Sequence, residues 1–178
     1  LADVTYVSGF EVPIPIGAGS EFAYGIPLAL CTVGDAHSWL VVSDGQGGKA
    51  RQESRLDELV TYDSFTHLHA MDSAASYLDA VRGALAGAGL RNVRGTLGIQ
   101  ARTLRFAVAR LIQEEFPELK LVEAGPALLE ARAIKTAREI ELLKRASHVA
   151  DVGHNTLARL AQTAGLDEFD MWAEITAR

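Results

Sequence analysis

The sequence has 178 residues, of which 48% are hydrophobic and 22% charged, a balance typical of a folded globular protein rather than a disordered or fibrous one. Seventeen Lys and Arg stand against 23 Asp and Glu, with no basic stripe interleaved with aromatic residues, which argues against nucleic-acid binding. No apolar run is long enough to span a membrane, and the single Cys31 excludes an internal disulfide. We therefore expect a cytoplasmic protein with neither nucleic acid nor membrane as a partner.

The first part of the chain predicts strands joined by turns. Val4–Phe10 is β-branched and aromatic, so it predicts a strand, and an unusually apolar loop follows it up to Tyr24. The apolar runs 28–33 and 38–43 flank a Gly-Asp turn and predict an antiparallel hairpin. Cys31 lies in the first run, where we expect its thiol to pack in the core rather than to act as a nucleophile.

From residue 49 onward, helices and strands alternate. Residues 49–58 predict a surface helix, followed by a short strand near residues 60–62. Ser73 and Thr103 are predicted N-caps of two amphipathic helices, and strands are predicted at 96–99 and 119–122. An antiparallel hairpin followed by crossover connections predicts an α/β fold with three layers, α/β/α, around a mixed sheet.

Gly125 and Pro126 mark a boundary, which predicts a domain over residues 1–130 and a helical segment over residues 131–178. Thr136 and Glu139 have the spacing of a capping box, so we expect a long helix to begin there and to stop at Gly165. Asp167 is then predicted to cap a last helix, whose apolar residues are Met171, Trp172 and Ile175.

Two segments resemble a known pattern. Residues 132–140, Arg-Ala-Ile-Lys-Thr-Ala-Arg-Glu-Ile, are followed after one long helix by Gly165-Leu166-Asp167-Glu168. This resembles the connection between the amino-terminal domain and the pita-bread catalytic domain of the creatinase, prolidase and aminopeptidase P family. Tyr6-Val7-Ser8-Gly9-Phe10 is similar to a segment found early in those amino-terminal domains. The resemblance covers essentially the whole chain.

The resemblance implies a non-catalytic amino-terminal domain of a metal-dependent Xaa-Pro peptidase, followed by the first helices of the catalytic domain. It implies two divalent metal ions, manganese, cobalt or zinc, held by residues outside this chain, a homodimer and a peptide substrate. It also implies that Tyr6, Phe10 and Glu11 help to gate the substrate entrance, although the apolar loop after Phe10 can equally pack on its own domain. Four residues form the expected interdomain linker: Arg132, Lys135, Thr136 and Glu139.

Other functional readings stay open at this point. The longer protein can be a creatinase-like amidinohydrolase or a catalytically dead relative that binds peptides or proteins. A small zinc enzyme built around His67 and His69 needs a third ligand that the sequence does not mark. His148 and His154 lie six residues apart on a predicted helix and cannot share an ion. The glycine-rich pieces lack the spacing of a phosphate loop, so the sequence predicts no catalytic or metal site of its own.

Overall fold

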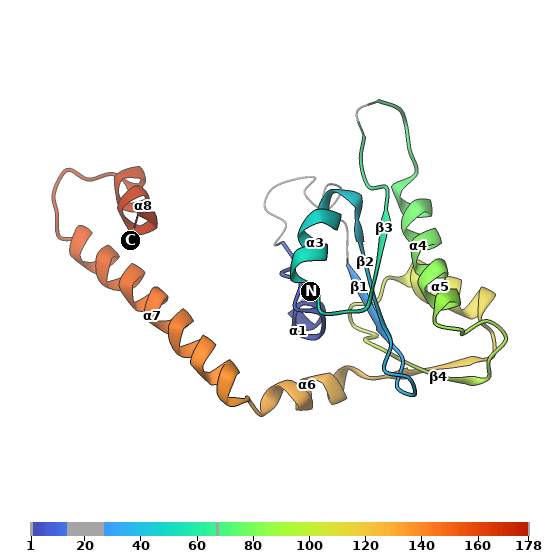
Figure 1. Cartoon of the computed structure of the whole chain (residues 1–178). Coiled ribbons are helices and arrows are strands. Elements are labelled where there is room, and N and C mark those ends of the chain that lie inside the picture. The colour runs from blue at the N-terminus through green and yellow to red at the C-terminus, as the bar shows by residue number, and fades with distance from the viewer. Residues whose placement is uncertain (1, 14–26, 67, 178) are drawn as a thin grey trace. The chain divides into compact units, whose positions relative to one another are not determined.

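The computed structural model describes residues 2–13, 27–66 and 68–177, which divide into two compact units, Leu1–Leu128 and Leu129–Arg178 (Figure 1). The division falls within α6 (Gly125–Ala133). Among the described helices, none combines the length and the apolar character that a membrane span requires.

The described residues of the first unit form two sheets. In the first, β2 (Ser38–Ser43) lies between β1 (Leu28–Cys31) and β3 (Glu58–Tyr62). β1 pairs with β2 antiparallel, as predicted for a hairpin, whereas β2 and β3 are parallel, so the sheet is mixed. In the second sheet, β4 (Gly95–Ile99) and β5 (Leu119–Glu123) are parallel. The predicted α/β class with a mixed sheet is confirmed.

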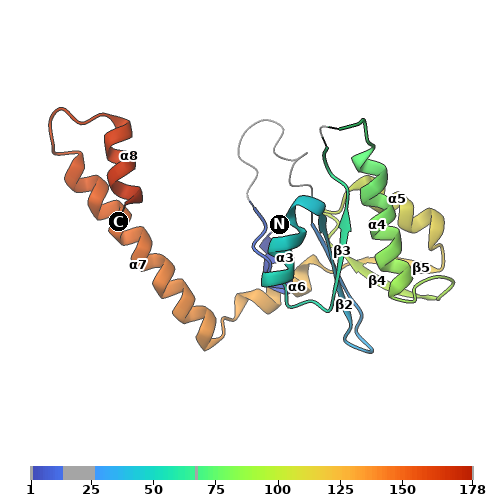
Figure 2. The same cartoon turned by 45° about the horizontal axis from the view of Figure 1, so that its top comes forward.

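Helices cover both faces of the first sheet because β2 is apolar on both of its faces. Successive side chains of a strand point to opposite faces. Trp39 and Val41 belong to the cluster that includes α4 (Ser73–Gly87), whereas Leu40 and Val42 pack with α3 (Gly47–Glu53). The short 3-10 helix η1 (Asp44–Gln46) joins β2 to α3. Figures 1 and 2 show α3 and α4 on opposite sides of the sheet, which gives the predicted three layers.

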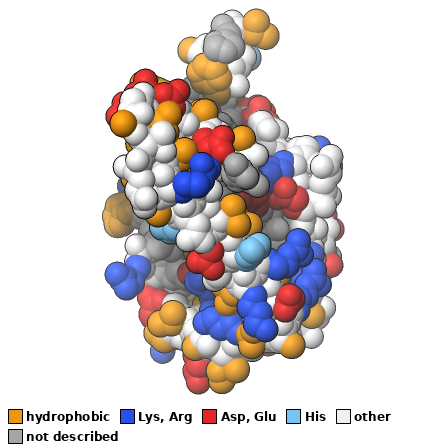
Figure 3. Space-filling model, turned by 90° about the vertical axis from the view of Figure 1, so that its left-hand side faces the viewer, with side chains coloured by type: hydrophobic (Ala, Val, Ile, Leu, Met, Phe, Trp, Pro, Cys, Tyr) orange, Lys and Arg blue, Asp and Glu red, His pale blue; other side chains and the backbone are white. Residues whose placement is uncertain are grey.

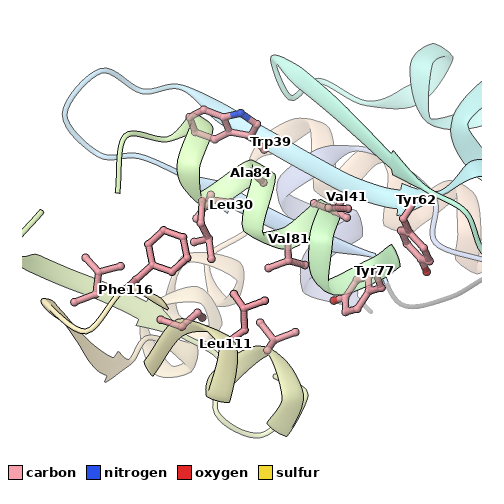
Figure 4. Packing of buried hydrophobic residues seen from close by; sticks show 14 residues of the cluster. Leu30, Trp39, Val41, Tyr62, Tyr77, Val81, Ala84, Leu111 and Phe116 are labelled. Carbon is pink, nitrogen blue, oxygen red and sulfur yellow. The ribbon is translucent and has the colours of Figure 1, made fainter. Parts of the chain in front are cut away.

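The larger hydrophobic core lies between the sheet, α4 and α5 (Phe106–Glu115) (Figure 4). The rings of Tyr62 on β3 and Tyr77 on α4 meet edge to face with their centroids 5.1 Å apart. Val81 lies against the sheet side of this core, and Phe116 closes its other end. Removal of these apolar side chains from water is the main favourable contribution to folding.

The prediction of a strand at Val4–Phe10 is wrong, because Ala2–Ser8 forms the helix α1. Gly9 ends the helix in the left-handed conformation, with φ of +75°, and its amide donates to the carbonyl of Thr5 at 2.8 Å. The hydroxyl of Ser8 donates to the carbonyl of Val4 at 2.6 Å. A glycine cap and these local hydrogen bonds therefore outweigh the strand propensity of the β-branched residues.

Three smaller predictions are also corrected. Asp72, not Ser73, caps α4, because its carboxylate accepts a hydrogen bond from the amide of Ala75 at 2.9 Å. Thr103 does not cap α5, which begins three residues later at Phe106 after a turn. Cys31 does not pack in the core, because it ends β1 beside the hairpin turn and its side chain is exposed.

The second unit contains α7 (Ala137–Leu160) and α8 (Glu168–Thr176). Both predicted caps are confirmed, since Thr136 with Glu139 and Asp167 with Asp170 form complete capping boxes. Gly165, with φ of +88°, lies in the turn between the helices, and Arg159 pairs with Glu174 at 3.3 Å. Trp172 is exposed, as are several apolar side chains of α7. Figure 3 shows exposed hydrophobic side chains scattered among charged ones on one face of the molecule.

Candidate functional site

The segment Ser8–Val12, which we call the α1 exit, is held on α3 by polar contacts. Lys49 Nζ of α3 donates to the carbonyl oxygen of Glu11 at 2.9 Å and approaches Glu11 Oε2 at 3.3 Å. The amide of Glu11 donates to Glu53 Oε2 at 3.0 Å. Lys49 also lies over the ring of Phe10, with Nζ 5.3 Å from the ring centroid. The α1 exit therefore has a fixed backbone course.

The three predicted gating residues differ in their exposure to solvent. Phe10 is completely buried, in a cluster with Val12, Leu40 and Val42, so it contributes packing and offers no atoms to a substrate. Tyr6 is 38% exposed and Glu11 is exposed. Of the three, only Tyr6 and Glu11 present side-chain atoms to solvent. Most of the predicted apolar loop, including Ile14, Ile16 and Phe22, lies outside the described residues.

The electrostatics of the α1 exit favour a positioning role. The hydrogen bond with Glu53 raises the pKa of Lys49, and the same hydrogen bond lowers the pKa of Glu53. Both groups are therefore charged at neutral pH. A general acid or base works best with a pKa near the operating pH, and these shifts move both groups away from it. Lys49 and Glu53 are thus suited to holding the backbone rather than to transferring protons.

The four predicted linker residues lie at the start of α7 and the end of α6. The amide of Thr136 donates to Glu139 Oε2 at 2.7 Å, and the amide of Glu139 donates to Thr136 Oγ1 at 3.2 Å. Lys135 Nζ donates to the carbonyl of Ala133 at 3.1 Å. Arg132 occupies the last turn of α6. The contacts of Thr136 and Glu139 fix the residue at which α7 begins.

The described histidines do not assemble a metal site. Among residues 2–13, 27–66 and 68–177, no group of three or more His, Cys, Asp or Glu side chains is arranged to hold an ion. His67 of the predicted His67–His69 pair lies outside those residues. His154 Nδ1 lies 2.8 Å from the carbonyl of Ala150 in its own helix, and His148 is exposed on the same helix. The described residues therefore do not fit a metal ion.

A cluster of His37, Asp57 and Glu58 at the end of the β1–β2 hairpin was not predicted from the sequence. His37 Nδ1 lies 3.8 Å from Asp57 Oδ2, and His37 Nε2 lies 3.5 Å from Glu58 Oε1. The imidazole also meets the indole of Trp39 edge to face, with ring centroids 4.6 Å apart. The parallel register that places Trp39 opposite Glu58 creates this cluster. No local sequence signal predicts that register, because the two strands are separated by η1 and α3.

Comparison with known families identifies a match over most of the chain. The sequence profile of the family described as the Creatinase/Prolidase N-terminal domain matches residues 1–134. A comparison with curated protein sequences finds no match.

Solved structures with a similar fold include three peptidases. An X-Pro aminopeptidase from Thermotoga maritima MSB8 is 18% identical, with a TM-score of 0.60 over 98% of this chain and 41% of its own. A prolidase from Pyrococcus furiosus is 23% identical, with a TM-score of 0.60 over 97% of this chain and 43% of its own. An Xaa-Pro dipeptidase from Bacillus anthracis is 20% identical, with a TM-score of 0.50 over 80% and 36%. The chain thus spans about two fifths of the length of these structures.

Proposed function

The chain belongs to the Creatinase/Prolidase N-terminal domain family, and on that premise we propose that it is the non-catalytic amino-terminal domain of a metal-dependent Xaa-Pro peptidase. The observation that carries this proposal is the fold likeness to an X-Pro aminopeptidase and a prolidase over nearly all of the chain. That likeness continues past residue 134, where the family match ends, into the two helices of the second unit.

In this proposal, catalysis takes place on a part of a longer protein that lies outside this chain. We propose that this part of the longer protein holds two divalent ions, manganese, cobalt or zinc, and acts on a peptide substrate. Such ions activate water for attack on an amide carbon and polarise its carbonyl oxygen. In this proposal, no described residue takes part in the attack of water on the amide.

We propose that residues 1–130 form the amino-terminal domain and that residues 131–178 form the linker and the first helices of the catalytic domain. Arg132, Lys135, Thr136 and Glu139 then connect the two. A capping box fixes where a helix begins, because each side chain satisfies a free backbone amide of the first turn. The Thr136–Glu139 box therefore fixes the residue at which α7 begins after the linker.

We also propose that the α1 exit helps to gate access of peptides in a cytoplasmic homodimer. Tyr6 and Glu11 are exposed beside a backbone that Lys49 and Glu53 hold in place. A fixed backbone with exposed polar side chains suits the exclusion or orientation of a substrate, because little further ordering is needed on contact. Phe10 supports this arrangement from within the core.

The gating proposal is tested in the longer protein by replacing Glu11 with Gln and Tyr6 with Ala. Glu118→Gln is the matched control, because Glu118 is an exposed carboxylate of the same unit that pairs with Arg94. We expect both test variants to change KM for peptides longer than a dipeptide while kcat for an Xaa-Pro dipeptide is unchanged. If Glu11→Gln and Tyr6→Ala leave KM for the longer peptides at the wild-type value, as Glu118→Gln is expected to do, the gating role is removed.

The peptidase proposal is tested by measuring bound metal and Xaa-Pro hydrolysis in the longer protein. Two bound divalent ions per chain together with Xaa-Pro hydrolysis are the expected result. A protein that binds no metal and hydrolyses no peptide is instead a catalytically dead relative. Hydrolysis of an amidine substrate in place of a peptide identifies an amidinohydrolase.

A further inference from the structure

The turn between β1 and β2, residues 32–37, is closed by hydrogen bonds between its two ends. We call this turn the hairpin tip. The amide of Thr32 donates to the carbonyl of His37 at 2.8 Å, and the amide of His37 donates to Thr32 Oγ1 at 3.1 Å. Ala36 lies in the left-handed region, with φ of +55°, a conformation that few residues other than glycine adopt. The backbone that carries His37 therefore has a defined course.

The two ring nitrogens of His37 each face a carboxylate at the start of β3. His37 Nδ1 lies 3.8 Å from Asp57 Oδ2, and His37 Nε2 lies 3.5 Å from Glu58 Oε1. A neutral imidazole has one N–H, so its other nitrogen turns a lone pair toward a carboxylate, whereas the imidazolium has an N–H on both nitrogens. The charged form of His37 alone can therefore attract Asp57 and Glu58 at the same time.

The carboxylates beside His37 stay charged over the range in which histidine side chains titrate. Ser38 Oγ donates to Asp57 Oδ2 at 2.6 Å, and this hydrogen bond lowers the pKa of Asp57. Within the hairpin tip, the hydrogen bond from the hydroxyl of Thr32 lowers the pKa of Asp35. Histidine changes charge between about pH 5 and 8, well above the range of carboxyl groups. His37 therefore faces fixed negative charge while a proton binds to or leaves its ring.

Neutral groups of β1 and α4 complete the surroundings of His37. Loss of surrounding water, with a smaller effect from the charge of Asp57, raises the pKa of the Cys31 thiol, so this thiol stays neutral in the same range. Trp39 packs on the last turn of α4, residues 84–87, which carries no ionisable side chain (Figure 4). The imidazole of His37 meets the indole of Trp39 edge to face, with ring centroids 4.6 Å apart. The charge of the cluster therefore changes with the protonation of His37.

We propose that His37, Asp57 and Glu58 form a pH-dependent clamp, which holds the hairpin tip on the start of β3 when His37 is protonated and releases it when His37 is neutral. The stabilisation is present at acidic pH and is lost as the pH rises through the range in which imidazolium loses its proton. Release of the imidazole also uncovers the edge of the Trp39 indole. This inference does not depend on the peptidase proposal, because it concerns only the first unit.

The first test measures hydrogen exchange of the Thr32 amide by NMR in the full chain, because this amide closes the hairpin tip. The rate in His37→Gln is divided by the rate in the wild type at the same pH, which cancels the intrinsic exchange rate. Exposed ion pairs are weak, so we expect this ratio to be about threefold larger near pH 5.5 than near pH 8. An equal ratio at both pH values would mean that ring packing on Trp39 alone holds the tip, and it overturns the proposal.

Two sets of variants control this measurement. His148→Gln is the matched control, because His148 is an exposed histidine on α7 of the second unit, and we expect a ratio near one at both pH values. Asp57→Asn with Glu58→Gln removes the two charges that face His37 while side-chain size is kept. In this background we expect the effect of His37→Gln to lose most of its pH dependence. An unchanged pH dependence there overturns the proposal.

The second test follows the release of the imidazole from Trp39. The chain has two tryptophans, and Trp172→Phe leaves Trp39 as the single indole. We expect acrylamide to quench the fluorescence of Trp39 more strongly near pH 8 than near pH 5.5. Adding His37→Gln is expected to remove this difference between the two pH values. Equal quenching at both pH values in Trp172→Phe overturns the release of the hairpin tip.

Discussion

Lys49 on α3 and Glu11 after α1 are joined by a hydrogen bond from Lys49 Nζ to the Glu11 carbonyl oxygen, 2.9 Å long. This contact connects residues that are 38 positions apart in the sequence and holds the α1 exit on α3. Glu53, one turn further along α3, accepts a hydrogen bond from the amide of Glu11 and another from Lys49. The segment that carries the proposed gating residues therefore depends on two charged side chains of α3.

The Glu53 contacts make stability depend on pH in the acid range. The hydrogen bond from Lys49 lowers the pKa of Glu53 in the folded state, while the unfolded value is near 4.3. Glu53 therefore stabilises the fold fully above its unfolded pKa, and that contribution is lost as the pH falls through the lower, folded pKa. Urea unfolding of the wild type and of Glu53→Gln from neutral pH downward measures this. We expect the difference in stability between them to shrink below pH 4.3, and a constant difference contradicts the assignment.

Gly9→Ala tests the cap that ends α1. An alanine at φ of +75° costs about 1–2 kcal/mol, and its Cβ would lie 2.6 Å from Arg55 Nε, which must move. Gly89→Ala is a matched control, because Gly89 has φ of +70° with nothing within 4 Å of an added Cβ. We expect both variants to lower the free energy of unfolding, with the larger loss for Gly9→Ala. Equal losses would show that the Arg55 contact contributes nothing.

Phe10→Ala tests whether Phe10 is a packing residue. The side chain is completely buried, so its removal leaves a cavity, and we expect a loss of about 3–5 kcal/mol in the free energy of unfolding. Phe106→Ala is the control, since Phe106 is 77% exposed and its loss is expected to change stability by about 0.5 kcal/mol or less. Similar effects of the two substitutions on thermal unfolding would contradict the burial of Phe10.

Thr136→Ala tests the capping box of α7. Loss of the hydroxyl removes the acceptor for the Glu139 amide and is expected to cost about 1 kcal/mol of helix stability. Thr136→Ser keeps that acceptor and is expected to restore most of the loss. Circular dichroism at 222 nm during thermal unfolding of the full chain measures both. Equal destabilisation by Ala and Ser would mean that the hydroxyl does not cap the helix.

Local sequence signals predicted those parts of the fold that local contacts determine. The capping box of Thr136 and Glu139 needs only four consecutive residues, and the structure forms it as predicted. The apolar run at Ser38–Ser43 predicted a strand, and all six residues are buried in β2. Tyr6–Phe10 marked a family segment correctly, but its secondary structure was mispredicted, because the φ of Gly9 and the packing of Phe10 decide it.

Contacts between side chains that are far apart in the chain could not be predicted from the sequence. The contact of Lys49 with Glu11 and the cluster of His37 with Glu58 depend on how helices and strands pack, which spacing along the chain does not specify.

The central claim, that this chain is a non-catalytic domain, is tested most directly by assaying the purified 178-residue chain supplied with manganese. The two readouts are bound metal, by elemental analysis, and hydrolysis of an Xaa-Pro dipeptide, with the longer protein assayed beside it. We predict metal binding and hydrolysis in the longer protein and neither in the chain. Hydrolysis by the chain itself, at a rate that follows its bound metal, would contradict the claim and would place the catalytic residues within this sequence.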